Sequence, residues 1–178
     1  ALQARRLLDD FLQRKLEGYS RLRNEPAVDG TSRLSPYLHF GQISPLQVAL
    51  AVRRAGSGSA AAEAFLEELV VRRELSMNFV HYNPRYDSYA CLPAWARTTL
   101  AEHAKDARAH VYALEDWESA RTHDPIWNAA QRELAATGRM HGYLRMYWGK
   151  KILEWSRGPE EAYETALSLN NRHELDGR

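Results

Sequence analysis

The chain has 178 residues, a length typical of one domain with a sizeable core. Hydrophobic residues make up 44% and charged residues 26%, and the formal net charge is +1, so the composition excludes a strongly basic or acidic protein. The single cysteine, Cys91, excludes an internal disulfide, and no apolar run reaches the ~20 residues of a membrane span. We therefore expect an intracellular, cytoplasmic protein without a membrane partner.

Helical periodicity dominates the N-terminal half. Apolar residues recur at three- and four-residue spacing over 2–22, which predicts an amphipathic helix. Ser44 followed by Pro45 predicts the N-cap and first turn of a short helix that ends near Arg54. A longer apolar stripe predicts a helix over 60–82.

The C-terminal half predicts five more helices. They cover residues 94–107, a short stretch near Asp116, residues 125–137 behind an Asp124 cap and before Gly138, residues 140–156, and a last helix ending near Leu169. No segment shows a convincing run of strand alternation. The sequence therefore predicts an all-α fold in a single helical domain, residues 1–178.

The stretch "GTSRLSPYLHFG", residues 30–41, lies in the loop between two predicted helices. Glycine and hydroxyl side chains let backbone N–H groups approach a ligand closely, and an arginine among them adds a fixed positive charge. This combination suits a phosphate or a pyrophosphate. The alternative is that Thr31, Ser32 and Ser35 only cap turns and helices.

Four longer stretches resemble one protein family. They are "TSRLSPYLHFGQIS", "FLEELVVRRELSMNFVHYNP", "THDPIWNAAQRELAATGRMHGYLRMYWGKKILEW" and "LNNRHELDGR". In this order they resemble the flavin-binding domain of class II cyclobutane pyrimidine dimer (CPD) photolyases. The resemblance implies a fragment of a longer photolyase without the N-terminal α/β antenna domain, so no antenna chromophore is expected. It also implies a monomer that acts on DNA containing such dimers.

The resemblance implies FAD as the cofactor, in the reduced form FADH⁻ when active. The residues at the family's FAD-binding positions are Tyr19, Thr31, Ser32, Arg33, Leu34, Ser35, Arg145, Asn170 and Asp176. The run 31–35 would hold the diphosphate. Arg145 would pair with Asp176 beside the flavin ring, where a cation stabilises the anionic reduced form, and Asn170 would lie near flavin N5. Without the family, a buried Arg–Asp pair is more often structural.

Other residues are placed at the lesion by the same resemblance. Glu68 would hydrogen bond the 5′ base of the dimer and stabilise the radical anion formed there. Glu68 and Arg72 are spaced i, i+4, which predicts that they share a helix face. Arg72, Met146 and Arg139 are the further candidates for contact with substrate or DNA, and a solvated charged face or core packing are the alternatives.

Tryptophan spacing gives a further signal. Trp148 and Trp155 are seven residues apart, so they lie on one helix face with about 10.5 Å of rise between them. With Trp127 they match the tryptophans that carry electrons to oxidised FAD in class II photolyases. Core packing alone is the alternative, and the two roles are compatible.

The function that follows from the resemblance is light-driven repair of CPDs by electron transfer from excited, reduced FAD to a dimer flipped out of the duplex. The catalytic residues would be Glu68, Arg145, Asn170 and Asp176. The alternative is a cryptochrome-like or truncated module that binds FAD or DNA without repair. His141 has no partners at ligand spacing, so no metal site is expected.

Overall fold

The computed structural model describes residues 1–177, which form helices and connecting loops without strands. The all-α prediction is therefore confirmed. The chain divides into two compact units, Ala1–Tyr82 and a second that begins at Asn83. The prediction that both belong to one domain stays a prediction.

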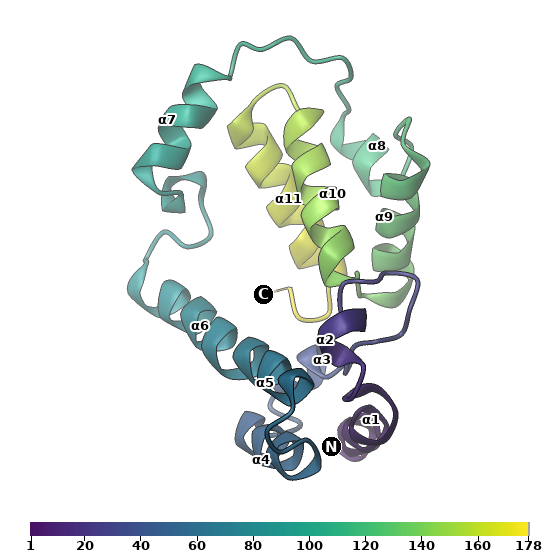
Figure 1. Cartoon of the computed structure of the whole chain (residues 1–178). Helices are drawn as coiled ribbons and strands as arrows, with labels where there is room; N and C mark the ends of the chain where they lie inside the picture. Colours follow the sequence, from purple (N-terminus) through teal and green to yellow (C-terminus); the bar gives the residue numbers. More distant parts are fainter. Residues whose placement is uncertain (178) are drawn as a thin grey trace. The chain divides into compact units, whose positions relative to one another are not determined.

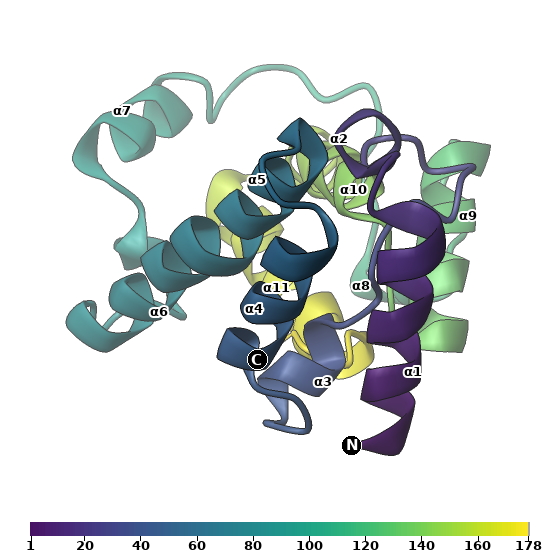
Figure 2. The ribbon, with the colours of Figure 1, turned by 60° about the horizontal axis from the view of Figure 1, so that its bottom comes forward.

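The N-terminal unit contains two longer helical rods together with shorter helices. Its elements are α1 (Leu2–Asp10), η1 (Phe11–Lys15), α2 (Tyr19–Leu22), α3 (Ser35–His39), α4 (Pro45–Ala55), α5 (Ala60–Leu66), η2 (Glu67–Arg72) and α6 (Arg73–Tyr82). The two rods are α1 with η1, and α5 with η2 and α6. Figure 2 shows α5 and α6 as parts of one continuous rod. The helix predicted over 60–82 is present and contains the π-helical segment η2. The single helix predicted over 2–22 is wrong in part, because a turn at residues 16–18 separates η1 from α2.

The core of this unit is aromatic at its centre. The ring centroids of Phe11 and Tyr19 lie 5.6 Å apart, and Phe65 lies 4.7 Å from Phe11 and 5.3 Å from Tyr19. All three side chains are buried. Edge-to-face and tilted contacts of this kind add to the hydrophobic gain from burial. They hold α5 against η1 and the start of α2.

The second unit contains η3 (Tyr89–Cys91), α7 (Ala94–Glu102), α8 (Leu114–Glu118), α9 (Pro125–Thr137), α10 (Gly142–Glu154) and α11 (Pro159–His173). Helices α9 and α11 both pack against α10, as Figure 1 shows. The core between them contains four buried tryptophans together with Leu134, Ile152 and Leu169. Among residues 1–177, no helix combines the length and the apolar character needed to cross a bilayer.

The predicted helix starts are confirmed by their caps. Ser44 Oγ accepts a hydrogen bond from the backbone N–H of Gln47, and Asp124 Oδ1 accepts from Ile126 at 2.7 Å and Trp127 at 3.0 Å. Each satisfies N–H groups that have no partner inside the helix.

Several helix bounds differ from the sequence prediction. Helix α7 ends at Glu102 rather than near residue 107, α10 spans Gly142–Glu154 rather than 140–156, and α11 continues to His173 rather than Leu169. Helix α3 has no predicted counterpart. Terminal turns are the least determined part of a periodic pattern, because neighbouring contacts decide whether they continue.

Candidate functional site

The site residues of the N-terminal unit stand on or beside the two π-turns. On η2, Glu68 Oε1 accepts a hydrogen bond from Arg23 Nη1 at 2.7 Å. Arg72 instead pairs with Glu67, at 3.6 Å. Glu68 and Arg72 therefore have different ion-pair partners, and the prediction that they share a helix face stays a prediction. A π-turn inside an α-helix is often found at functional sites.

Tyr19 belongs to the core of this unit and touches the same polar group. Its side chain is buried, and this burial raises the pKa of its phenol. The Arg23 guanidinium lies 5.9 Å from the Tyr19 ring centroid, within the range of a cation–π contact. Tyr19, Arg23 and Glu68 therefore form one connected group in which an exposed carboxylate is held by a cation over a buried ring.

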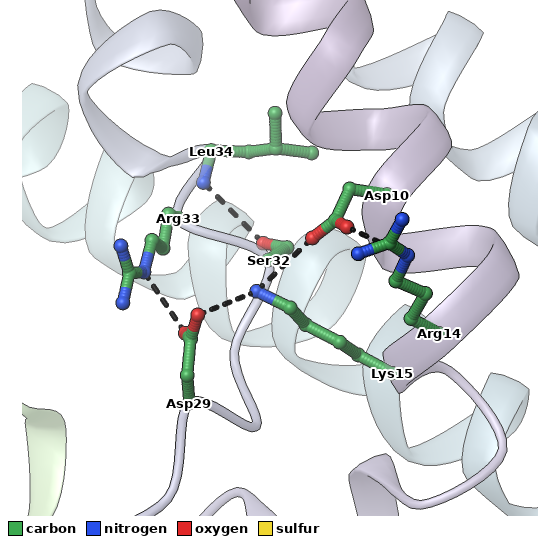
Figure 3. A network of polar contacts seen from close by, with 7 residues as sticks. All are labelled: Asp10, Arg14, Lys15, Asp29, Ser32, Arg33 and Leu34. Atoms are coloured by element: carbon green, nitrogen blue, oxygen red, sulfur yellow. Dashed lines mark hydrogen bonds and ion pairs between the residues drawn. The ribbon is translucent and has the colours of Figure 1, made fainter.

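A second ionic group holds the loop before α3 (Figure 3). Asp29 accepts from Lys15 Nζ at 2.9 Å on one oxygen and from Arg33 Nε at 2.9 Å on the other. Burial opposes the charge on Asp29, but the two cations outweigh it and hold the pKa of Asp29 below its ordinary value. Lys15, the last residue of η1, also pairs with Asp10 at the end of α1, so one ammonium group links α1 to the loop.

The residues 31–35 follow this anchor directly. Arg33 has a positive φ of 56°, which a side chain other than glycine adopts only when its surroundings impose it. Leu34 is buried, and its N–H lies 3.4 Å from Ser32 Oγ. Ser35 begins α3. The loop is fixed by a buried leucine on one side and an ion pair on the other, while the Arg33 side chain stays 42% exposed.

In the second unit, the predicted partner of Arg145 is wrong. Arg145 Nη2 pairs with Glu174 Oε1 at 2.9 Å, and the Glu174 side chain is only 3% exposed. Asp176, the expected partner, has a buried Oδ1 without a hydrogen-bond partner among the described residues. The chain turns after α11 so that Glu174 faces α10. Glu174 was missed because two carboxylates stand in "ELDGR" and spacing alone does not choose between them.

The carboxyl group of Glu174 has a strongly raised pKa. Burial raises the pKa of its carboxyl to about 7; Asp176 adds to the rise and Arg145 opposes it. The ion pair therefore does not compensate fully for removal from water. The Nε2 of the neighbouring His173 is also buried without a partner within residues 1–177. Unsatisfied polar atoms of this kind are rare in a folded chain, and they fit a site that a polar ligand completes.

Asn170 is hydrogen bonded to the turn that follows α11. Asn170 Nδ2 donates to the Gly177 carbonyl at 2.7 Å, and a Cβ on Gly177 would stand 2.7 Å from that same nitrogen. The turn is also tied to the end of α9, because the Leu175 N–H donates to the Gly138 carbonyl at 2.9 Å. Gly138 has a φ of 69°, and a Cβ there would lie 2.6 Å from Leu175 Cγ. The turn after α11, which carries Glu174, is thus hydrogen bonded both to Asn170 and to the end of α9.

The tryptophans form a continuous series of ring contacts. The Trp127 and Trp148 rings are nearly parallel with centroids 6.4 Å apart. Trp117 lies 4.9 Å from Trp127 and stacks on Trp155 at 6.1 Å. Sequence reasoning missed Trp117, because it stands on the five-residue helix α8 and no helical spacing relates it to the others.

The remaining lesion candidates lie outside this buried group. Met146 is 57% exposed on α10, and Arg139 is half-buried between α9 and α10. Within residues 1–177, no group of three or more His, Cys, Asp or Glu side chains is arranged to hold a metal ion.

Comparison with known proteins shows extensive similarity. The chain is 58% identical over 172 residues to a deoxyribodipyrimidine photo-lyase of Methanothermobacter thermautotrophicus, covering 97% of this chain and 38% of that protein. It is 53% identical over 172 residues to the Arabidopsis thaliana deoxyribodipyrimidine photo-lyase, covering 96% of this chain and 35% of the relative. The chain belongs to the photolyase family. No family model matches it.

A solved photolyase structure has a related fold. A bacterial class III photolyase from Agrobacterium tumefaciens aligns with a TM-score of 0.65 and 26% identity, over 97% of this chain and 37% of that chain. The chain therefore spans little more than a third of the length of the photolyases it matches. The all-α architecture agrees with this photolyase neighbour.

Proposed function

We propose that this chain is the FAD-binding and catalytic part of a class II photolyase that repairs cyclobutane pyrimidine dimers in DNA. The family membership and the resemblance of its motifs support this assignment. The observation that carries it is the series of contacts among Trp148, Trp127, Trp117 and Trp155, all of them buried. Ordinary core packing does not require four indoles in one series of contacts, whereas electron hopping through the protein does need oxidisable rings at short range.

Reduced FAD, when bound, supplies the light-excited electron that opens the cyclobutane ring of the dimer. Arg33 and its neighbours in 31–35 bind the diphosphate, for which the partly exposed guanidinium and the rigid loop are suited. Tyr19 forms part of the same binding surface. Arg145 provides the positive charge beside the flavin ring. Asn170 places its amide near N5 of that ring.

The buried polar atoms of the second unit fit this cofactor. Asp176 Oδ1 and His173 Nε2 have no partner within residues 1–177, and both lie in or beside the turn that follows α11. A ring system with several hydrogen-bonding edges would satisfy such atoms. Glu174 keeps Arg145 oriented, and its raised pKa makes the net charge of this group responsive near neutral pH.

The lesion is contacted by Glu68, with Arg72, Met146 and Arg139 as further contacts to the dimer or the DNA. Glu68 is 43% exposed and already oriented by Arg23, so its second carboxylate oxygen is available for a base edge. A positioned carboxyl group near a developing radical anion stabilises charge that the ground state lacks.

The test is flavin retention followed by repair. The purified chain is expected to bind FAD and, after chemical reduction, to restore intact pyrimidines in a dimer-containing oligonucleotide under near-UV light. Arg33→Glu is expected to abolish flavin retention, because it turns an attractive charge into a repulsive one. Arg14→Glu is the matched control, since Arg14 also makes an i,i+4 pair with an aspartate. Flavin binding without dimer repair would favour the cryptochrome-like alternative, and equal flavin content in both variants would remove the loop from the site.

A further inference from the structure

The indole N–H groups of the predicted electron-transfer tryptophans have different acceptors. Trp127 Nε1 donates to the Trp148 carbonyl at 3.1 Å, and Trp148 Nε1 donates to Gln131 Oε1 at 2.8 Å. Both acceptors are neutral and buried. Trp155 Nε1 instead donates to Glu154 Oε1, at 3.3 Å. Trp155 is therefore the one of these three whose N–H meets a carboxylate.

This difference matters because losing an electron makes the indole N–H strongly acidic. A carbonyl or amide oxygen accepts a hydrogen bond but is too weak a base to remove a proton from an oxidised indole, whereas a carboxylate can do so. A general base has to lie within hydrogen-bond reach of the proton it removes. Glu154 meets this condition for Trp155. The acceptors of Trp127 and Trp148 do not.

Charges around Trp155 favour the loss of that proton. Lys151 Nζ lies 5.1 Å from the Trp155 ring centroid and 2.7 Å from Glu154 Oε2. Its positive charge opposes a second positive charge on the oxidised ring. The hydrogen bond from Lys151 also holds the pKa of Glu154 below its ordinary value, so the carboxylate is ionised at neutral pH. The His123 ring, 4.6 Å from Trp155, and the Tyr112 ring, 6.0 Å from it, are further titratable groups that face Trp155, and Tyr147 interacts with the charge of Glu154.

The different exposure of Trp155 and Glu154 provides a route by which the proton can leave the core. Trp155 is only 3% exposed, while the Glu154 side chain is 55% exposed. A proton that reaches Glu154 has therefore left the core and is in contact with water.

We propose that the Glu154 carboxylate accepts the indole proton of Trp155 after Trp155 has given up one electron. The step rests on the proposed function, in which photoexcited oxidised flavin takes that electron through the other tryptophans. The N–H bond of Trp155 breaks and an O–H bond forms on Glu154, which leaves a neutral indolyl radical and a neutral carboxylic acid. Glu154 then releases the proton to water, and an external thiol reductant returns one electron to the radical while water returns a proton. Deprotonation traps the oxidised site at Trp155 and slows charge recombination.

The experiment is flash photolysis of the FAD-loaded chain, with absorption spectra that separate the tryptophan radical cation from the neutral radical. In the parent chain the cation signal is expected to convert into the neutral radical. Glu154→Gln keeps the side-chain volume and an acceptor oxygen, and the conversion is expected to slow by at least about tenfold. Glu154→Asp keeps a carboxylate and is expected to convert faster than Glu154→Gln. Glu161→Gln, which removes a different ion pair, between Glu161 and Arg157, is expected to match the parent.

A second measurement needs no flavin. In a ¹H–¹⁵N spectrum of the flavin-free chain, the Trp155 indole resonance, assigned by its loss in Trp155→Phe, is expected to shift in Glu154→Gln and to stay in place in Glu161→Gln.

The outcomes separate the two proposals. An unchanged rate of radical deprotonation in Glu154→Gln would overturn the role of Glu154 alone. A flash signal that is the same in Trp155→Phe as in the parent would overturn the electron-transfer role of Trp155, and the Glu154 step with it.

Discussion

The two units differ in where their main charged and aromatic candidate residues lie. In the N-terminal unit, Glu68 and Arg33 are partly exposed, stand at a π-turn or a strained loop, and are held by ion pairs. In the second unit, the tryptophans are buried, and Arg145 is held by the buried Glu174. Exposed ionic groups contribute little to folding, whereas buried rings contribute much. The first set is therefore suited to binding, and the second combines folding with electron transfer.

Among the buried tryptophans, substitution of Trp148 is expected to have the largest effect. Trp148→Phe keeps most of the apolar volume but removes an easily oxidised ring and leaves Gln131 Oε1 without its donor. Light-driven reduction of bound FAD is expected to fall by about a hundredfold, equivalent to a barrier increase of about 2.7 kcal/mol. The unfolding free energy is expected to fall by about 1–3 kcal/mol.

The control is Trp95→Phe, because Trp95 is 74% exposed. Repair by chemically pre-reduced protein is expected to stay near the parent rate in both variants. If Trp148→Phe photoreduces like the parent, the buried tryptophans serve packing alone.

The exposed set is tested at Glu68. Glu68→Gln is expected to lower dimer repair by about tenfold while flavin stays bound, because it removes a charge from the proposed lesion contact. Stability is expected to change by less than about 1 kcal/mol, since the Arg23 pair is partly exposed. Repair kinetics and urea unfolding measure both quantities. Glu67→Gln, which removes the neighbouring pair with Arg72, is the control, and an equal loss of repair there would show a general charge effect.

Glu174 predicts a pH dependence of stability that belongs to the second unit. Its pKa rises from the ordinary 4.5 to about 7 in the folded chain, so the folded state holds a proton that the unfolded state releases in this window. The unfolding free energy of flavin-free protein is therefore expected to fall as pH rises from about 5 to about 7, by about 1–3 kcal/mol. Denaturation series at several pH values measure it.

Glu174→Gln is expected to flatten that slope, and substitution of the exposed Glu164 is expected to leave it unchanged. A slope that survives in Glu174→Gln would assign the proton to another group.

The smallest effect concerns Gly138, which links α9 to the turn carrying Glu174. Gly138→Ala places a Cβ 2.6 Å from Leu175 Cγ at a φ of 69°, and we expect a loss of about 1–2 kcal/mol. Thermal unfolding measures it. Gly149→Ala on α10 meets no atom within 4 Å and is expected to stabilise by up to about 1 kcal/mol. Equal melting temperatures for the two variants would show that the turn adjusts freely.

Local chemistry accounts for what sequence alone predicted. The caps at Ser44 and Asp124 and the glycine after α9 are signals contained within a few residues, and the structure confirms them. The apolar stripes likewise predicted the two long rods. The motifs were long enough to indicate the photolyase family by themselves.

Tertiary contacts decided the rest. Glu68 pairs with Arg23, which is 45 residues away in the chain, and no spacing rule relates the two. The turn after α11 selects Glu174 rather than Asp176 for Arg145, because Leu175 is tied to the end of α9. Trp117 joins the tryptophan series only when α8 packs beside α9. Periodicity describes one helix at a time, and these pairings depend on where separate segments meet.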